Sequence, residues 1–477
     1  MTTLEMPATF PVASHTDNVG KGSTFVVIKG LSKDGLEFVP LALERGASRI
    51  VCQKGTVFSE ELQNLCSFYN ATIEYVDYTR KALAYLSAHA AGYPAQKLKL
   101  YAVTGTKGKT SSVWMLYHIL CNMSVKVALI STVGNYIGNR VFNAGMTTPQ
   151  PDYIHQFFTL CVESGVTHVV METAAQATTF SRLETLEFDG LIFTNLEQEH
   201  GELYSSLDIY FEAKRALCDF LKPAGNLVVN YDGIYGKKLA SLYSEGITFS
   251  FEDQTASYYC TYTVAYDEKT IVTLKYNNQE YVFTYAQFIG FFNAYNFVGV
   301  CILLLQQGFS GEAIQKTLAS VPVISGRMEK YRLKNGATVI IDYAHTPSSF
   351  EALFKTLVSS HTKLSIVFGA GGGKDTAKRP IMGKLAAEYG HRVYITNDNP
   401  RYDEPLDIAL QIYNGIPEKQ RCKVIIELDR QKAIERAIAE SDHATFILLL
   451  GKGPDEYQLI QGQKLFFSER FIALEHQ

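Results

Sequence analysis

The residues best placed to do chemistry lie in one short stretch with two glycines. Gly105 and Gly108 lack a Cβ atom, so the backbone can turn its N–H groups inward around phosphate oxygens. Lys109 can supply a cation to the outer phosphates, and Thr110 can supply a hydroxyl to Mg²⁺. The general phosphate-loop pattern has a third glycine where this chain has Val103, so a glycine turn with a surface lysine is the competing interpretation. We interpret the stretch as a phosphate-binding loop.

Such a loop must lie between a strand and a helix, and the flanking residues fit both. Residues 98–103 are mostly apolar, and residues 113–120 have apolar side chains at helical spacing. More apolar strands alternate with amphipathic helices farther along, at 125–130, 168–172, 190–194 and 226–230. This alternation predicts an α/β fold in which helices cover both faces of a mostly parallel sheet.

Polar side chains follow two of these strands. In a parallel sheet the working residues collect at the carboxyl edge, where the strands end. Glu172 ends one strand and His200 follows the next, and we expect both strands to flank the strand of the phosphate loop. Glu172 and His200 would then reach Thr110 as ligands of Mg²⁺. Lys214 lies in a helical pattern, and its spacing alone predicts a solvent-exposed lysine.

The alternation divides the chain into three predicted domains. Residues 1–97 form a small N-terminal α/β domain, and residues 98–325 form a central P-loop ATPase-like domain with a parallel sheet. The central domain includes a β-rich insert at about 247–285. From 326 to 477 strands and helices alternate again, which predicts a C-terminal Rossmann-like domain.

Composition excludes several classes of protein. The chain has a net charge of -4 over 477 residues and no Lys/Arg-rich tract, so it lacks the basic stretch that is typical of nucleic-acid binding. Small molecules are therefore the expected partners. The eight cysteines are scattered, so neither a disulfide framework nor a zinc site is predicted. No apolar run is long enough to span a membrane, and the N-terminus has no signal-like pattern. We expect a cytoplasmic monomer with no membrane insertion.

A series of short motifs follows one another along most of the chain. They are Gly105-Thr106-Lys107-Gly108-Lys109-Thr110, Thr147-Thr148-Pro149, Glu172, Thr194-Asn195-Leu196, Tyr210-Phe211-Glu212-Ala213-Lys214, Asn293 with Asn296, Arg327, Asp342-Tyr343-Ala344-His345, Lys378-Arg379-Pro380, Asp398-Asn399-Pro400-Arg401, Asp429-Arg430 and Gly451-Lys452-Gly453. In this order they resemble the Mur ligases, most closely the MurE type. That type adds the third residue to the peptide of the cell-wall precursor UDP-N-acetylmuramoyl-L-alanyl-D-glutamate.

The resemblance implies a mechanism with ATP between the central and C-terminal domains, and a nucleotide-sugar site in the N-terminal domain. A carboxylate of the acid substrate attacks the γ-phosphorus and forms an acyl phosphate and ADP. The amine of an amino acid then displaces phosphate through a tetrahedral oxyanion, which needs cationic stabilisation. Closure of the domains is implied, because neither half alone completes the site.

The resemblance also assigns roles to residues. It assigns catalysis to Lys109, Lys214, His200 and Arg327. It assigns ATP to Gly105, Thr106, Lys107, Gly108, Lys109, Thr110, Ser111, Asn293, Asn296, Arg327 and Asp342. It assigns Mg²⁺ to Thr110, Glu172, His200 and Lys214, the last as a carbamylated lysine. It assigns the acid and the amino acid to Thr147, Thr148, Arg182, Arg379, Asp398, Asn399, Pro400, Arg401, Gly451 and Asp455.

Two clues to the amino acid disagree. Arg401 can pair with a carboxylate through two hydrogen bonds, and the MurE enzymes with this motif favour meso-diaminopimelate, which has a distal carboxylate. Residues 451–457, Gly-Lys-Gly-Pro-Asp-Glu-Tyr, look more like the lysine-adding enzymes. We favour meso-diaminopimelate over L-lysine.

The chain departs from the family pattern at three places. Residues 15–17 are His-Thr-Asp in place of Asp-Ser-Arg, residues 173–176 are Thr-Ala-Ala-Gln in place of Val-Ser-Ser-His, and residues 371–376 lose a charge pair. Backbone groups and water can substitute for the lost side chains. Otherwise the chain is a MurE-like paralogue of specialised metabolism that joins an amino acid to another carboxylate. The motifs at 398–401 and 451–453 argue against a folate as that carboxylate. A nucleotide-hydrolysing switch is the alternative from another class.

Overall fold

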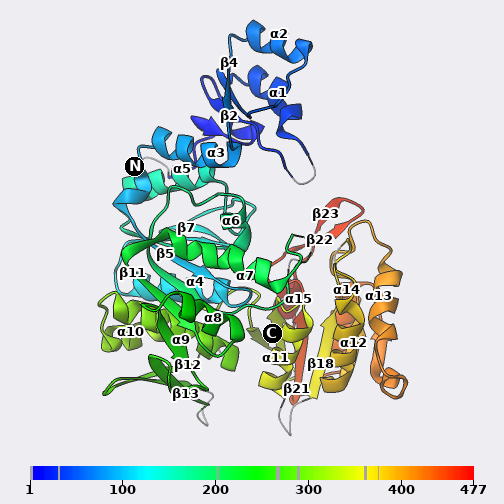
Figure 1. Cartoon of the computed structure of the whole chain (residues 1–477). Helices are drawn as coiled ribbons and strands as arrows, with labels where there is room; N and C mark the ends of the chain where they lie inside the picture. The colour runs from blue at the N-terminus through cyan, green and yellow to red at the C-terminus, as the bar shows by residue number, and fades with distance from the viewer. Residues whose placement is uncertain are drawn as a thin grey trace. The chain divides into compact units, whose positions relative to one another are not determined.

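The structure, a computed structural model, describes residues 4–30, 33–199, 201, 203–264, 269–286, 290–358, 363–373 and 375–477. The chain packs as two compact units. Unit 1 comprises Met1–Tyr285 and Tyr295–Val321, and unit 2 comprises Ala286–Ala294 and Pro322–Gln477. Figure 1 colours most of unit 1 from blue to green and most of unit 2 from yellow to red.

Unit 1 begins with a parallel sheet of four strands in the order β1-β2-β3-β4. Its elements are β1 (Val12–Ala13), β2 (Thr24–Val26), α1 (Val39–Glu44), β3 (Arg49–Gln53), α2 (Glu60–Phe68), β4 (Thr72–Val76) and α3 (Thr79–Ala90). The central strands are apolar on both faces because both faces are covered. Phe25 and Ile50 pack in the core of α1 and α2, whereas Val26 and Val51 pack against Leu83 of α3.

The main sheet of unit 1 has its strands in the order β15-β14-β13-β12-β11-β10-β5-β9-β6-β7-β8. They are β5 (Lys99–Thr104), β6 (Val127–Ser131), β7 (Gly134–Ile137), β8 (Arg140–Phe142), β9 (His168–Glu172), β10 (Phe188–Phe193), β11 (Leu221–Asn230), β12 (Ile247–Ser250), β13 (Tyr258–Val264), β14 (Thr270–Tyr276) and β15 (Gln279–Tyr285). The strands from β6 to β13 in this order are parallel, and both ends of the sheet are antiparallel hairpins.

Helices cover both faces of this sheet (Figure 1). They are α4 (Lys109–Asn122), α5 (Pro151–Glu163), α6 (Ala175–Thr179), α7 (Leu207–Arg215), α8 (Ile234–Leu242), α9 (Phe291–Gln306) and α10 (Gly311–Leu318). Helices α5 to α8 share one core with Ala102, Met171 and Phe193. On the other face α9 approaches closely because β10 has a glycine there: a Cβ atom at Gly190 would lie 2.5 Å from Cδ1 of Leu303.

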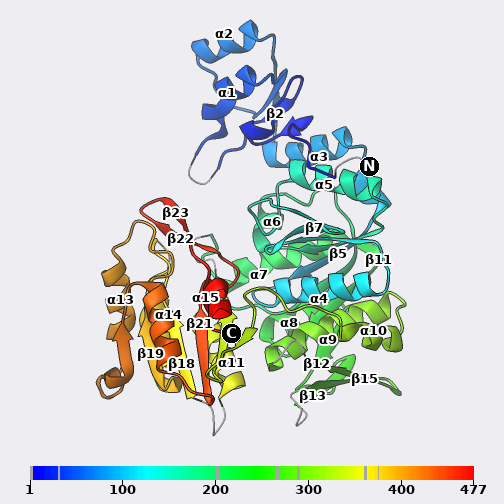
Figure 2. The ribbon, with the colours of Figure 1, turned by 180° about the vertical axis from the view of Figure 1, so that it is seen from behind.

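Unit 2 contains a sheet in the order β16-β17-β21-β18-β19-β20, parallel except for β16, and a separate hairpin of β22 and β23. Its elements are β16 (Glu329–Arg332), β17 (Thr338–Asp342), α11 (Pro347–Leu357), β18 (Lys363–Phe368), α12 (Lys378–Tyr389), β19 (Arg392–Ile395), α13 (Pro405–Asn414), β20 (Val424–Ile426), α14 (Arg430–Ala439), β21 (Thr445–Leu450), β22 (Tyr457–Ile460), β23 (Gln463–Phe466) and α15 (Glu469–Glu475). Helices α11 to α13 pack on one face, and α14 and α15 pack on the other (Figure 2).

The predicted α/β fold class is confirmed, and the β-rich insert is the β12 to β15 region of the main sheet. The boundaries of the three predicted domains stay a prediction, because the compact units group the N-terminal sheet with the main sheet. Within the described part of the chain, none of the helices has the length and apolar character needed to cross a lipid bilayer.

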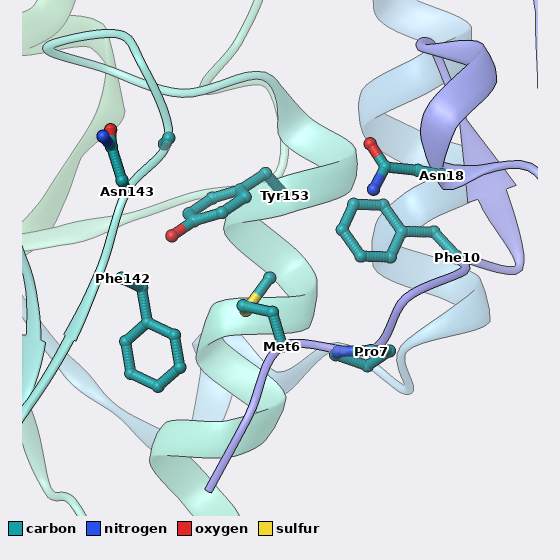
Figure 3. A pocket seen from close by; sticks show the side chains of 8 residues that line it. Met6, Pro7, Phe10, Asn18, Phe142, Asn143 and Tyr153 are labelled. Carbon is teal, nitrogen blue, oxygen red and sulfur yellow. The ribbon is translucent and has the colours of Figure 1, made fainter.

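The N-terminal sheet meets the main sheet of unit 1 at α5, where a cavity of about 380 Å³ opens. Figure 3 shows the side chains that line it. They are Met6, Pro7, Phe10 and Asn18 from the N-terminal segment, and Phe142, Asn143, Ala144 and Tyr153 from the main part. We call this region the joint of unit 1.

A buried ion pair anchors two loops of unit 2. The Arg430 guanidinium donates to Glu469 Oε1, to the Asn397 carbonyl at 3.0 Å and to the Leu450 carbonyl at 2.8 Å. The Arg430 and Glu469 side chains are 0% and 2% exposed. Asn397 and Leu450 stand just before two of the motifs found in the sequence, so this pair fixes the backbone that presents them.

Arg430→Met should destabilise unit 2 by about 3–5 kcal/mol, because it leaves the Glu469 carboxylate buried without its cation. The measurement is the midpoint of urea unfolding. Arg436→Met is the matched control, since Arg436 pairs with Glu440 on the exposed surface of the same helix and its loss should cost less than about 1 kcal/mol. Equal midpoints for the two variants would contradict the anchoring role.

Candidate functional site

The strand order places the predicted site residues at one edge. β5 lies between β9 and β10, as expected, and all three strands run parallel. The phosphate-binding loop follows β5, and α4 begins at Lys109. Side chains that follow β9 and β10 therefore flank the loop, as the carboxyl-edge rule requires.

Both loop glycines are required by the backbone and by their surroundings. Gly105 has a φ of +146° and Gly108 a φ of +83°, which side chains rarely tolerate. A Cβ atom on Gly105 would lie 1.9 Å from Oγ1 of Thr194, and one on Gly108 would lie 2.0 Å from Oδ1 of Asn296. The loop thus has no room for larger residues at these two positions.

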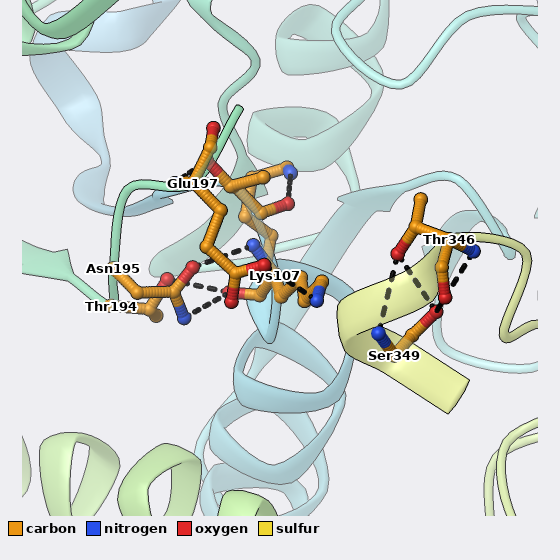
Figure 4. A network of polar contacts seen from close by, with 8 residues as sticks. Lys107, Thr194, Asn195, Glu197, Thr346 and Ser349 are labelled. Atoms are coloured by element: carbon orange, nitrogen blue, oxygen red, sulfur yellow. Dashed lines mark hydrogen bonds and ion pairs between the residues drawn. The ribbon is translucent and has the colours of Figure 1, made fainter. Parts of the chain in front are cut away.

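The segment after β10 clamps the loop from one side (Figure 4). The Lys107 N–H donates to Oδ1 of Asn195, and the Thr106 N–H donates to its backbone oxygen, both at 2.9 Å. The Lys107 carbonyl accepts from Thr194 Oγ1 at 2.6 Å and from Asn195 Nδ2 at 3.1 Å. Glu197 pairs with the Lys107 ammonium at 2.7 Å. These contacts with residues 194–197 hold the loop conformation from that side.

A carboxylate and a hydroxyl meet beside the loop. Thr110 Oγ1 donates to Glu172 Oε1 at 3.0 Å, and Glu172 is only 2% exposed. The second oxygen of Glu172 accepts from Ser131 Oγ at 2.9 Å and from the N–H and hydroxyl of Thr132, both at 3.0 Å. This places two of the predicted Mg²⁺ ligands, Thr110 and Glu172, in direct contact.

Lys214 is not the exposed lysine that its helical spacing predicts. It is 1% exposed, and its ammonium donates to the Gly105 carbonyl at 2.6 Å, 4.5 Å from the centre of the Tyr210 ring. Lys109 donates to the same carbonyl at 3.0 Å and to the Thr106 carbonyl at 2.8 Å. Burial, reinforced by the charge of Lys109, holds the pKa of Lys214 well below its ordinary value. Packing of α7 on the loop overrides the helical pattern.

The residues assigned to the acid substrate lie on the far side of Glu172. Thr147 Oγ1 shares a hydrogen bond with Thr132 at 3.0 Å, and Thr148 Oγ1 donates to the Glu172 carbonyl at 2.9 Å. Arg182 donates to the Thr148 carbonyl at 2.6 Å. Its buried Nε has no hydrogen-bond partner among the described residues.

Three further residues assigned to ATP lie on helices. Ser111 is half-buried in the first turn of α4. Asn293 and Asn296 are buried in the first turns of α9, 5% and 6% exposed. Asn296 faces Gly108 of the phosphate loop, which is the close approach described above.

Unit 2 brings Arg327 and Asp342 together. The Asp342 carboxylate accepts from the N–H groups of Met328 and Ala344, each at 2.8 Å. Burial raises the pKa of Asp342, although the charge of Arg327 acts in the opposite direction. The Arg327 guanidinium lies 4.7 Å from the centre of the Tyr343 ring. An anchored carboxylate beside a stacked guanidinium fits recognition of a polar ligand such as a ribose phosphate.

A second group of predicted residues gathers at the carboxyl edge of the unit 2 sheet. The buried Lys452 ammonium lies 3.5 Å from Asp398 Oδ1 and donates to Asn399 Oδ1 at 3.2 Å. Gly451 has a φ of +107°, and a Cβ atom there would lie 3.0 Å from Asp398 Oδ2. Asp455 is half-buried, and burial raises its pKa. The motifs around 398 and 451 thus form one cluster.

The arginines assigned to the amino acid differ in their surroundings. Arg401 has a φ of +57°, and its N–H donates to the Leu459 carbonyl of the β22–β23 hairpin at 2.8 Å. Arg379 is 2% exposed and donates to Gly371 O at 2.9 Å and Gln411 Oε1 at 2.8 Å. The Arg379 guanidinium therefore makes most of its hydrogen bonds to other residues of unit 2. Pro400 lies against Gly372, whose Cβ would be 1.9 Å from the Pro400 carbonyl.

One predicted residue, His200, lies outside the described residues. The sequence interpretation missed Ser131 and Thr132, which position Glu172, and it named Asn195 within a motif without its contact to the loop. Ser131 ends β6 and Thr132 follows it, so the carboxyl-edge rule that identified Glu172 could have found both. The contact between Asn195 and the loop depends on tertiary packing, which spacing does not reveal.

Comparisons with known proteins agree with this geometry. The family model for the Mur ligase middle domain matches residues 103–304, and the model for the Mur ligase glutamate ligase domain matches residues 326–453. The chain is similar to proteins named UDP-N-acetylmuramoyl-L-alanyl-D-glutamate--2,6-diaminopimelate ligase. It is 32% identical to that of Cytophaga hutchinsonii over 462 residues and 34% identical to that of Clostridium tetani over 466 residues. Each alignment covers 96% of this chain and 92% of the relative.

Solved structures share the fold. A structure of a UDP-N-acetylmuramoyl-L-alanyl-D-glutamate--2,6-diaminopimelate ligase superposes with a TM-score of 0.67 at 23% identity, covering 98% of this chain and 94% of that one. The MurF ligase from Thermotoga maritima in complex with ADP gives a TM-score of 0.66 at 19% identity, with coverage of 95% and 96%.

Gly108→Ala should weaken ATP binding at least about tenfold, because the φ of +83° and the contact with Asn296 both oppose a Cβ atom. The measurement is calorimetric titration with a non-hydrolysable ATP analogue. Gly233→Ala is the control, since nothing lies within 4 Å of its added Cβ and its φ is -108°. Unchanged affinity in Gly108→Ala would mean that the loop does not hold the nucleotide.

Proposed function

Because the chain belongs to the Mur ligase family, we propose that it joins an amino acid to UDP-N-acetylmuramoyl-L-alanyl-D-glutamate and converts ATP to ADP and phosphate. The proposed amino acid is meso-diaminopimelate. The names of the relatives support this choice, and so does the guanidinium of Arg401, which can pair with a distal carboxylate. The reaction belongs to the synthesis of the peptidoglycan precursor.

The observation that carries the proposal is the convergence of four side chains on one loop. Lys109 and Lys214 share the Gly105 carbonyl, and Thr110 contacts Glu172. A nucleotide-hydrolysing phosphate loop already needs Lys109, Thr110 and a carboxylate such as Glu172 for Mg²⁺. The additional feature is the buried Lys214 beside Lys109, which supports the ligase over a simple hydrolase.

The residues present fit Mg²⁺. A hydroxyl and a carboxylate oxygen already lie 3.0 Å apart, and both are ligand types that Mg²⁺ prefers. Mg²⁺ is commonly held by one or two carboxylates together with phosphates and water. Thr110 and Glu172 would hold the ion, with His200 as a further proposed ligand. When bound, Mg²⁺ would neutralise charge on the transferred phosphate.

Lys214 fits carbamylation. Carbon dioxide reacts only with an uncharged amine, and burial beside the Lys109 cation favours the uncharged form of Lys214. A carbamate on Lys214 would place an anion beside the Lys109 cation. It would also place a carboxylate-like group within reach of the proposed metal ligands.

The chain's own residues then support two successive steps. The substrate carboxylate attacks the γ-phosphorus while Lys109 and the loop N–H groups hold the phosphates, and ADP leaves. The amine of the amino acid attacks the acyl carbon, loses a proton, and displaces phosphate. Thr147, Thr148 and Arg182 are proposed to position the acid. Arg327 and Asp342 are proposed for the phosphate and ribose, and Asn293 and Asn296 for the adenine.

A second candidate is a paralogue with a different acid. The departures at residues 15–17 and 174–175 favour it, because they remove groups that the family pattern places near the nucleotide sugar. In this structure Asp17 instead pairs with Arg45 at 2.7 Å, and the Ala174 N–H donates to Thr148 Oγ1 at 3.0 Å. The residues proposed to form the acyl phosphate are the same in both candidates.

The deciding experiment incubates the protein with ATP, UDP-N-acetylmuramoyl-L-alanyl-D-glutamate and a panel of amino acids, followed by mass analysis. The expected product contains meso-diaminopimelate, and ADP should appear only when acid and amino acid are both present. ADP release without either substrate would favour a hydrolytic switch. No product across the panel would favour the paralogue.

Lys109→Ala should lower kcat at least about 100-fold, because it removes the cation that stabilises the transferred phosphate. The measurement is the rate of ADP release with both substrates present. Lys237→Ala serves as a control because Lys237, on α8, is half exposed and pairs with Asp253 at 3.2 Å. Full activity in Lys109→Ala would contradict the assigned role.

Lys214 should give a carbamate signal in ¹³C NMR after incubation with ¹³C-bicarbonate, and Lys214→Ala should lose both this signal and its activity. The physical reason is the lowered pKa of the buried amine. Full activity of Lys214→Ala with no dependence on bicarbonate would show that the carbamate assignment is wrong.

A further inference from the structure

A buried carboxylate ties the N-terminal sheet to the main part of unit 1. Asp152, in the first turn of α5, is 3% exposed. Its Oδ2 accepts from the Ser14 N–H at 2.7 Å and from the Ser14 hydroxyl at 2.8 Å. Its Oδ1 accepts from the Tyr153 N–H at 3.0 Å. Both oxygens of Asp152 are therefore used as acceptors.

Ser14 occupies a position where ligands commonly bind. It directly follows β1, at the carboxyl edge of the parallel N-terminal sheet. Asp152 lies beside Tyr153, one of the residues that line the cavity of the joint (Figure 3). The Asp152–Ser14 contact thus holds the ligand-facing edge of one sheet against the first turn of α5.

The same turn is connected to the reactive centre. Four residues before Asp152, Thr148 donates to the Glu172 carbonyl at 2.9 Å, and Glu172 accepts from Thr110 of the phosphate loop at 3.0 Å. The Asp152–Ser14 contact and the Thr148–Glu172 contact therefore lie at the two ends of one short segment, residues 148–152. The hydrogen bonds to the Asp152 carboxylate are charge-assisted and restrict geometry tightly, so together with this short segment they can set a distance between two binding regions.

The proposed acid substrate is long, with a nucleotide at one end and the reacting carboxylate at the other. We propose that Asp152 is a positioning residue for this acid: it fixes the edge that holds the nucleotide end at the distance from the phosphate loop that brings the carboxylate to ATP. This inference rests on the proposed function. Asp152 acts through Ser14 and does not touch the reacting atoms.

Asp152→Asn tests the inference. The amide of asparagine has one acceptor oxygen and one NH₂ donor group. In this variant the NH₂ group would face either the Ser14 N–H or the Tyr153 N–H, so one hydrogen bond would be lost. The KM for the UDP-linked acid should rise about tenfold and its kcat should fall, because the carboxylate is less well placed for attack, while the KM for ATP stays within about twofold. Ser14→Ala should show a smaller rise, because the backbone N–H remains, and Ser14→Thr should restore the wild-type KM.

Asp189→Asn is the matched control. Asp189 also accepts from a backbone N–H, that of Leu100 at 2.9 Å, and it pairs with Lys222, but it lies near the start of β5, at the opposite edge of the main sheet. This variant should lower the melting temperature without changing the KM for either substrate. If Asp152 had only a structural role, Asp152→Asn would likewise lower the melting temperature and leave the KM for both substrates unchanged.

A truncated acid, N-acetylmuramoyl-L-alanyl-D-glutamate without UDP, separates positioning from general damage. Wild type and Asp152→Asn should use it with the same KM, because its nucleotide end is absent. Two results for Asp152→Asn would overturn the inference: an equal rise in KM for both acids, or an unchanged KM for the UDP-linked acid. Neither result would affect the proposed function, as long as the wild type turns over the UDP-linked acid. Failure of the wild type to use the UDP-linked acid would overturn the proposed function, and the inference with it.

Discussion

One backbone oxygen organises the site. The Gly105 carbonyl accepts from both Lys109 and Lys214, which lie on helices more than a hundred residues apart in sequence. Only a residue without a Cβ atom can adopt the φ of +146° that turns the backbone this way against Thr194. Burial, and after it the charge of the neighbouring Lys109, hold the pKa of Lys214 well below its ordinary value. The geometry of the loop thus determines the chemistry of Lys214.

Much of the fold follows from local rules. The apolar strands around the loop, their parallel packing and the convergence of Thr110 with Glu172 could be predicted, because strand order and carboxyl edges obey general constraints. The burial of Lys214 could not be predicted, since helical spacing does not say which partner covers a face. The family resemblance, and not the spacing, identified this residue.

The two departures that touch the acid site have local explanations. Thr148 accepts from the Ala174 N–H, so a backbone group forms a contact where the family pattern has a hydroxyl nearby. Asp17 occupies the position of the family arginine and pairs with Arg45. A guanidinium therefore lies close to that position, although it belongs to a different residue. Neither contact can be read from the sequence, because each joins residues from different elements.

The buried guanidinium of Arg430 has a consequence for how this protein can change over evolutionary time. It fixes the chain at Asn397 and Leu450, immediately before the two segments that gather around Asp398 and Gly451. With those backbones fixed, a side chain on either segment can be exchanged without moving the chain that presents it. Side chains of the two segments can therefore change one at a time while the architecture persists.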